Sequence, residues 1–283
     1  MLAQNRPGSP GWLRYEPGNS KGLPNHGWKD SADALVSDQS GRRVAPVPIM
    51  LAKVQAYAYE AFSRFVDLTT RHRWLADQLD FRRLVDIASL IEYAEFMKRE
   101  FHNTFHHDGY YVMAIGGDGA PVTGLTSNMG HLLGTGLLDD HQSAQVAELL
   151  ESDDLNSGWG LRTRARGHHH FNPQGYHSGA VWAHDTAIAI RGLTLSAESA
   201  IAAHPQEAAL CAQAARRLAT GLIDAAAAFD YRLPELYAGG DREPDARAPL
   251  PFPTACRPQA WSAAGAVAVW DSLNRLDRIG LSE

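Results

Sequence analysis

The sequence predicts an all-α protein built from helical hairpins. Apolar residues recur at spacings of three and four over most of the chain, which is the period of one helix face. The helical segments are rich in Ala and Leu, whereas the long stretches between them hold most of the Trp, His, Asn and Asp residues. We therefore expect a helical scaffold that carries its chemistry on its loops.

About seven helical segments follow one another after an irregular beginning, which we expect to be mostly loop over 1–47. They cover 48–68, 78–103, 127–138, 139–152, 179–203, 206–229 and 257–277. The apolar face predicted for the first is Leu51, Val54, Ala58, Ala61 and Phe65. The stripe predicted for the second is Leu84, Ile87, Ala88 and Ile91. We expect all of them to form one domain over 1–283.

One stretch, 104–126, does not have helical spacing. The run Tyr-Tyr-Val-Met-Ala-Ile precedes Gly-Gly-Asp-Gly at 116–119, and a second short run follows, which predicts a small β-hairpin inside a loop. The glycine-rich turn lacks the Lys-Ser/Thr of a phosphate-binding loop. Two further loops are expected at 153–176 and 231–256.

Charge and cysteine content exclude several classes of function. The chain has 26 Lys and Arg against 32 Asp and Glu, a net charge of −6, and this argues against nucleic-acid and anionic-membrane partners. No apolar run approaches the length of a membrane span. Two cysteines do not make a disulfide framework, and no secretory leader is recognisable, so we expect a cytoplasmic location.

Two loop carboxyl groups are candidates for proton transfer. Asp30 stands beside Trp28 and Lys29 in a glycine-flanked loop, and Glu235 stands between apolar neighbours just after a helix. Glycoside hydrolysis needs two carboxyl groups on either side of one bond, and only tertiary folding could bring these two together. Taken singly, each could equally be a helix cap or a solvated turn residue.

The segments 157–163 and 171–185 have the composition of a polyol-binding cleft, with two Trp, two His, and Arg, Asn and Asp. Asn128 and His131 could add to it. His184 and Asp185 could instead form a buried structural pair. Consecutive histidines at 168–170 seldom give a closed coordination shell, so we expect no metal site.

Seven motifs together resemble the bacterial glycogen-debranching-type amylo-α-1,6-glucosidases, in the order of that family and over nearly the whole chain. They are Gly-Leu-Pro-Asn-His-Gly-Trp-Lys-Asp-Ser at 22–31, Val-Gln-Ala-Tyr at 54–57, Ser-Asn-Met-Gly-His-Leu-Leu at 127–133, Ser-Gly-Trp-Gly-Leu-Arg-Thr at 157–163, Tyr-His-Ser-Gly-Ala-Val-Trp-Ala-His-Asp at 176–185, Leu-Pro-Glu-Leu at 233–236 and Pro-Thr-Ala-Cys-Arg-Pro-Gln-Ala-Trp at 253–261.

The resemblance implies an (α/α)6 toroid and inverting hydrolysis of an α-glucosidic bond in glycogen-like glucans or small glucosides. It assigns Asp30 as general acid and Glu235 as general base, roughly 6.5–9.5 Å apart to admit a water molecule. It implies a carbohydrate as the partner, and neither an organic cofactor nor a metal. The residues expected to bind the sugar are Trp28, Lys29, Gln55, Asn128, His131, Trp159, His177, Trp182, His184 and Asp185.

The chain departs from the family pattern in three respects. Lys53 stands where Glu is expected, and His26 where Gln is usual. A toroid needs twelve helices, so we expect an incomplete ring that lacks N-terminal helices, with the missing part of the enzyme as a partner. Two alternatives therefore stay open: a sugar epimerase or isomerase with His177 and His184 as acid and base, and an inactive or carbohydrate-binding fragment.

Overall fold

The computed structural model describes residues 11–17, 22–41, 43–72, 74 and 86–281. Within these residues the chain forms six α-helices and one 3₁₀-helix, η1. They are α1 (Ala52–Arg71), α4 (Ile87–Phe105), η1 (Ser127–His131), α5 (Asp140–Glu151), α6 (Ala183–Ala200), α7 (Pro205–Ala228) and α8 (Ala260–Arg278). The predicted all-α fold of helical hairpins is confirmed, with fewer helices among the described residues than the twelve of a full toroid, and residues 78–85 of the predicted second helix lie outside the described part.

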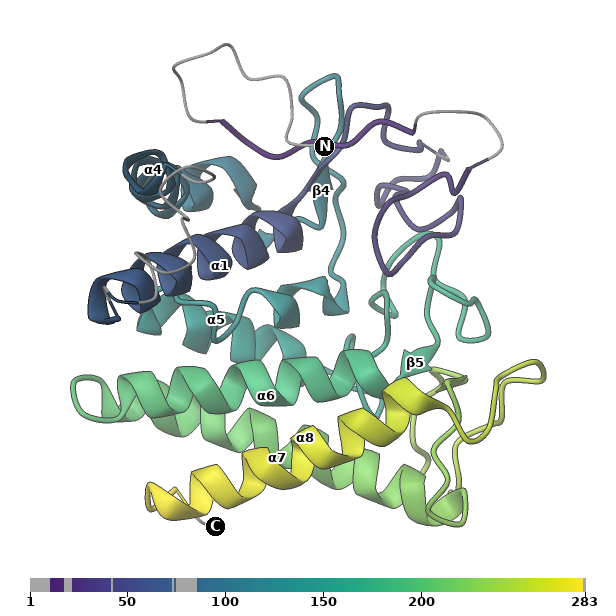
Figure 1. Ribbon diagram of the computed structural model, residues 1–283. Coiled ribbons are helices and arrows are strands. Elements are labelled where there is room, and N and C mark those ends of the chain that lie inside the picture. Colours follow the sequence, from purple (N-terminus) through teal and green to yellow (C-terminus); the bar gives the residue numbers. More distant parts are fainter. Residues whose placement is uncertain (1–10, 18–21, 42, 73, 75–85, 282–283) are drawn as a thin grey trace.

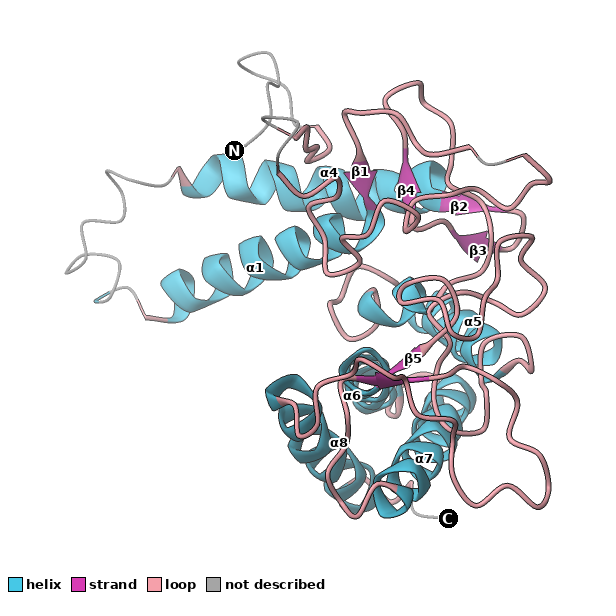
Figure 2. Cartoon of the chain, turned by 90° about the vertical axis from the view of Figure 1, so that its right-hand side faces the viewer, coloured by secondary structure: helices cyan, strands magenta, loops and turns pink. Residues whose placement is uncertain are grey.

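The helices pack as neighbouring pairs. α6 lies against α7, α8 and η1, α7 lies against α5, and α1 lies against α4 (Figure 1). The α6–α7 link is only four residues long, which makes the two helices antiparallel neighbours. Figure 2 looks onto the end of the molecule where the loops gather, so the loop residues share one face. None of the described helices is long and apolar enough to cross a bilayer.

Three two-residue strand pairs fasten these loops, and all three are antiparallel. β1 (Met50–Leu51) pairs with β4 (Ala114–Ile115), and β2 (His106–His107) pairs with β3 (Tyr110–Tyr111). β5 (Val181–Trp182) pairs with β6 (Leu236–Tyr237). The β1–β4 and β5–β6 pairs join segments that are more than fifty residues apart in sequence, so they fix the loops relative to one another.

The predicted hairpin turn is confirmed, although its strands differ from the expected run. Gly116 N–H donates to the Ala120 carbonyl, and Ile115 forms a β-bridge with Pro121. Tyr110–Tyr111 and Ala114–Ile115 are separate strands with separate partners, because β4 pairs with β1 and β3 pairs with β2. Alternating side chains cannot show which remote strand a short run will meet.

The helix predicted over 127–138 is wrong beyond its first turn. Only Ser127–His131 is helical, as a 3₁₀ turn. Gly134 and Gly136 have φ of 71° and 82°, a left-handed conformation that interrupts a right-handed helix. The short turn still packs closely, because a Cβ on Gly130 would lie only 2.6 Å from the Cβ of Ala189 on α6. The absence of that atom lets η1 approach α6.

The face predicted for the first helix is right in part, and the stripe predicted for the second is largely wrong. Of the first, Leu51 is buried but belongs to β1, Val54 and Ala58 pack against the core, and Ala61 is exposed. The buried residues of α1 are Ala52, Lys53, Gln55, Ala56 and Thr69.

On α4, Ala88 and Ile91 are exposed, and Leu84 lies outside the described residues. The buried residues of α4 are Met97, Phe101 and Phe105, all in its C-terminal half. Periodicity therefore located a helix without showing which end is covered.

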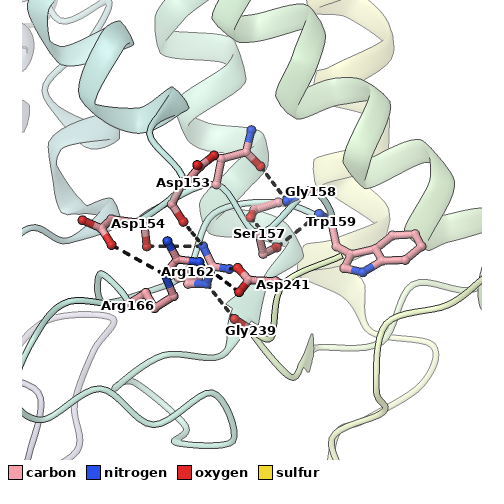
Figure 3. Close-up of polar contacts among 11 residues, drawn as sticks. Asp153, Asp154, Ser157, Gly158, Trp159, Arg162, Arg166, Gly239 and Asp241 are labelled. Carbon is pink, nitrogen blue, oxygen red and sulfur yellow. Dashed lines mark hydrogen bonds and ion pairs between the residues drawn. The ribbon is translucent and has the colours of Figure 1, made fainter. Parts of the chain in front are cut away.

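Arg162 joins two loops at the end of the molecule where the loops gather (Figure 3). Its guanidinium is fully buried and donates to the Gly239 carbonyl at 2.7 Å and the Asp153 carbonyl at 2.8 Å. It also forms an ion pair with Asp241, which Arg166 reaches from the surface at 3.0 Å. One side chain therefore holds the 153–166 loop against the 236–241 segment.

We expect Arg162→Met to lower the free energy of unfolding by about 3–5 kcal/mol, because it leaves buried carbonyl groups without donors. Urea unfolding followed by circular dichroism measures this change. Arg166→Met removes the exposed partner of the same Asp241 and should leave the midpoint almost unchanged. Equal effects of the two substitutions would contradict the role given to burial.

Candidate functional site

Trp28 is the centre of an aromatic cluster at the loop face. Its ring centroid lies 4.8 Å from that of His184, 5.3 Å from that of Trp182 and 5.4 Å from that of His177, each in an edge-on arrangement. His131 stacks near it with a centroid separation of 6.2 Å. The indole N–H of Trp28 is buried without an acceptor among the described residues.

The two candidate carboxyl groups lie beside consecutive residues of one loop. Asp30 Oδ1 is 3.9 Å from His177 Nδ1, and Glu235 Oε1 accepts a 2.8 Å hydrogen bond from the Tyr176 hydroxyl. Both carboxyl groups are partly exposed, so a ligand can reach them. Asp30 and Glu235 are distant in sequence, but folding places them beside two consecutive residues. Asp30 lies near His177, and Glu235 is bonded to Tyr176.

The position of Glu235 follows from its backbone. Leu236 pairs with Trp182 in the β5–β6 ladder, which brings the Glu235 segment to the 176–182 loop. The Glu235 N–H donates to the Cys256 carbonyl at 2.9 Å, and the Ser262 hydroxyl donates to the Pro234 carbonyl at 2.8 Å. The carboxyl group is therefore carried by a backbone that is fixed on both sides.

A buried hydrogen-bonded chain lies on another side of the cluster. His131 Nε2 is 2.7 Å from Asp185 Oδ1, and the Tyr57 hydroxyl is hydrogen-bonded to His131 Nδ1. Burial would raise the pKa of Asp185, but the hydrogen bond from His131 and the nearby charge of Lys29 hold that pKa well below its ordinary value. Burial also lowers the pKa of His131, so neutral His131 donates to Asp185 and accepts from Tyr57.

Two buried lysines stand close to the Trp28 ring. Lys29 Nζ lies 5.2 Å and Lys53 Nζ 5.5 Å from the ring centroid. Lys29 donates to the Thr163 carbonyl at 2.7 Å and to the Ser127 hydroxyl at 3.2 Å, whereas Lys53 Nζ has no hydrogen bond or ion pair with any described residue. Burial lowers the pKa of Lys29 to about 7 and that of Lys53 to about 8.

A cavity of about 600 Å³ opens next to this cluster, between α1, α6 and α8. Its polar and aromatic lining comes from Trp28, Lys53, Tyr57, His131, His184 and Trp261. Arg191 also lines it, together with small residues of α6 and α8. Asp30 and Glu235 are not part of this lining. The aromatic cluster thus connects the two carboxyl groups with a cavity of ligand size.

Most of the predicted sugar-binding residues lie in this region. The structure brings together Trp28, Lys29, His131, His177, Trp182, His184 and Asp185. Asn128 is buried in η1 with its side-chain oxygen unpartnered. His184 and Asp185 do not bond to each other, because Asp185 uses His131 as its partner.

Two predicted residues lie apart from the cluster. The Gln55 amide donates to the Leu13 and Leu51 carbonyls, so it holds the N-terminal segment. Trp159 is buried beneath the Arg242 guanidinium, 4.1 Å from its ring centroid, in the region that Arg162 organises (Figure 3). Neither lines the cavity. His169 of the consecutive histidines pairs with Asp38 at 2.7 Å, and no described group of His, Cys, Asp and Glu has the arrangement of a metal site.

Sequence reasoning missed several residues of the site. Tyr57 and Trp261 stand in quoted motifs but received no role, and Lys53 was noted only as a departure. Tyr176 directly precedes His177, and it reaches Glu235. Adjacency to a predicted residue was the available signal for Tyr176, whereas only the tertiary packing of α1 and α8 shows that Tyr57 and Trp261 share a cavity.

Comparison with known proteins points to glycoside hydrolases. The profile of the mannosylglycerate hydrolase MGH1-like glycoside hydrolase domain family matches residues 85–232, just over half of the chain. No curated protein sequence matches. Solved structures similar in fold include the GH63 mannosylglycerate hydrolase from Thermus thermophilus in complex with glucose, with 17% identity and a TM-score of 0.53 over 79% of this chain and 45% of that one.

The same enzyme in complex with Tris and D-glycerate gives 19% identity and a TM-score of 0.51 over 79% of this chain and 46% of that one. An uncharacterized conserved protein from Thermus thermophilus gives 16% identity and a TM-score of 0.52 over 79% of this chain and 48% of that one. At such identities the likeness concerns the fold alone. The chain spans just under half the length of these solved structures.

The buried Lys29 predicts a specific pH dependence of stability. Its pKa is about 7 in the folded chain and about 10.4 when unfolded, so between these values the unfolded state binds more protons and stability rises with pH. We therefore expect wild type to gain stability relative to Lys29→Met as the pH rises through this window. Urea unfolding of both proteins at several pH values measures the difference, and parallel curves would contradict the assignment.

Proposed function

Because this chain belongs to the mannosylglycerate hydrolase MGH1-like glycoside hydrolase domain family, we propose that it hydrolyses a glycosidic bond with inversion, with Asp30 as general acid and Glu235 as general base. The observation that carries the proposal is the placement of both carboxyl groups beside Tyr176 and His177. Two partly exposed carboxyl groups at one loop are the minimum equipment for this reaction.

In the proposed reaction Asp30 protonates the departing glycosidic oxygen while Glu235 takes a proton from the attacking water. The water enters from the face opposite the leaving group, which requires a separation of roughly 6.5–9.5 Å between the carboxyl groups. The rings of Trp28 and Trp261, which line the cavity, supply flat apolar surfaces for a sugar ring.

We propose as substrate an α-glucosidic bond in a small α-glucoside or a glycogen-like glucan. The support comes from the resemblance of the sequence motifs and from the aromatic rings and uncharged histidines around Trp28. Burial lowers the pKa of His177 to about 3 and that of His184 to about 4, so both rings are uncharged near neutral pH. Uncharged polar groups and aromatic rings suit a neutral hexose.

A second candidate substrate is a glycoside whose aglycone carries a carboxylate. The cavity is lined by the ammonium of Lys53, which has no acceptor among the described residues, and by Arg191. The related mannosylglycerate hydrolase has been crystallised with D-glycerate, which carries such a group. An acidic aglycone placed in the cavity would give Lys53 the partner that the described residues do not provide.

The neutral histidines disfavour the epimerase alternative. Epimerisation by His177 and His184 needs one imidazole as the acid while the other acts as the base. With pKa values of about 3 and about 4, neither ring would carry the second proton of an imidazolium at neutral pH. Hydrolysis by the two carboxyl groups does not need these rings to ionise.

We propose that further helices of the same enzyme complete the ring and act as the partner of this chain. α8 exposes Val267 and Trp270, which lie three residues apart and therefore on the same face of the helix. Large apolar side chains grouped on one helix face favour an interface. A carbohydrate-binding role without turnover is the alternative, and activity measurements decide between them. A cytoplasmic location also stays a proposal.

We expect Glu235→Gln and Asp30→Asn each to lower kcat by about 10²- to 10⁴-fold, because each removes one proton-transfer group. Glucose release from maltose, isomaltose and α-glucosylglycerate measures the rate. Proton NMR of the first product should show the β-anomer, since inversion at an α-linkage changes the configuration.

Glu243→Gln is the matched control, because it makes the same chemical change on an exposed loop residue. It should retain the wild-type rate. A Glu235→Gln variant with wild-type activity would refute the general-base assignment, and α-anomeric product would refute inversion.

For the second candidate substrate, Lys53→Met should raise KM about tenfold for a glycoside with a carboxylate aglycone, which corresponds to one lost charged hydrogen bond. The KM for the corresponding neutral glycoside, such as a glucosylglycerol, should change little, so it serves as an internal control. An equal change in both KM values would contradict the proposal that Lys53 binds the carboxylate of the aglycone.

A further inference from the structure

We propose that Tyr176 is a positioning residue that orients the ionised Glu235 carboxylate for attack by water, an inference that rests on the proposed function. The Tyr176 hydroxyl donates its single proton to Glu235 Oε1 at 2.8 Å. That bond occupies one carboxylate oxygen, which leaves Oε2 as the acceptor for the proton of the attacking water.

Tyr176 is itself held from several sides. Its ring packs edge-on against His177 and Trp182, with centroids 4.7 Å away in both cases, and against Phe252 at 5.9 Å. Its carbonyl accepts a 2.7 Å hydrogen bond from the Trp182 indole. Although Tyr176 is 39% exposed, these ring contacts fix the position of its hydroxyl oxygen, and the bond to Glu235 then sets the direction of the O–H bond.

The charges around Tyr176 keep it a donor. The groups that face it are Glu235, Asp30 and Cys256, and the adjacent His177 is uncharged. Burial and the hydrogen bond to Glu235 both raise the pKa of the Tyr176 hydroxyl well above its ordinary value, and the charge of Asp30 adds to this. The proton therefore stays on Tyr176, which acts as the donor in this hydrogen bond.

The bond also connects the proposed base to the proposed acid. Tyr176 and His177 are consecutive, and His177 Nδ1 lies 3.9 Å from Asp30 Oδ1 and 3.0 Å from the Ser31 hydroxyl. A displacement of Tyr176 and His177 would therefore change the surroundings of Asp30 and of Glu235 at the same time. The spacing that inversion requires is thus coupled to the packing of one loop.

The test is Tyr176→Phe, which keeps the ring and removes only the hydroxyl. We expect kcat to fall about 10- to 100-fold, the loss that corresponds to one hydrogen bond to a charged group, with KM changed less than about twofold. A residue that served only the packing of the loop would change KM together with kcat, so a loss confined to kcat is the signature of the positioning role.

α-D-Glucosyl fluoride separates base from acid, because fluoride leaves with little protonation. On this substrate Asp30→Asn should retain activity, whereas Glu235→Gln and Tyr176→Phe should both be slow. Tyr231→Phe is the matched control, since it removes the same hydroxyl from a side chain that is 81% exposed. Its kcat and KM should equal those of wild type.

Thermal unfolding of each variant excludes loss of fold as the cause. If Glu235→Gln is slow while Tyr176→Phe keeps the wild-type kcat, the positioning role is overturned and the proposed function stands. A lower kcat accompanied by an equally large rise in KM also overturns it. If Glu235→Gln is fully active, the proposed function fails, and the role of Tyr176 fails with it.

Discussion

The geometry of the loop face depends on one buried cation. Arg162 has no exposure to solvent, and its donors satisfy carbonyl groups of the 153–154 loop and of Gly239. The β5–β6 ladder starts next to these contacts and carries Glu235 toward Tyr176. Short strands of two residues would hold such a loop only weakly, so the charged hydrogen bonds of Arg162 supply the rigidity that the small ladder lacks.

Around Trp28 the buried carboxylate is paired inside the protein, while hydrogen-bonding groups without a carboxylate line the cavity. Asp185 is ionised and buried, its partner His131 is neutral, and Tyr57 closes the chain at the cavity wall. Because the Tyr57 proton is committed to His131, the Tyr57 oxygen faces a ligand as an acceptor, while Lys53 faces it as a donor. The cavity thus offers both kinds of partner to hydroxyl groups without placing a free carboxylate among them.

The sequence predicted the order of the described α-helices, because 3.6-residue periodicity is a local signal. It was right only in part about the buried face of α1 and largely wrong about that of α4, since burial depends on which neighbours cover each end. For the site, motif resemblance selected residues that do meet, such as Trp28, His177 and Trp182. It misplaced Gln55 and Trp159 and overlooked Tyr176, because side-chain partners are decided by tertiary contacts that no spacing encodes.

The geometry of the pocket also depends on residues without polar side chains, because η1 lies very close to α6. Since Gly130 leaves no room for a methyl group against Ala189, the height of the neighbouring His131 above Asp185 is set by backbone contact. A methyl group added at Gly130 would move the His131 imidazole away from Asp185 and leave that buried carboxylate without its hydrogen-bond donor. Natural variation in the electrostatics of the pocket should accordingly arise from exchanges among the smallest amino acids as readily as from changes of charge.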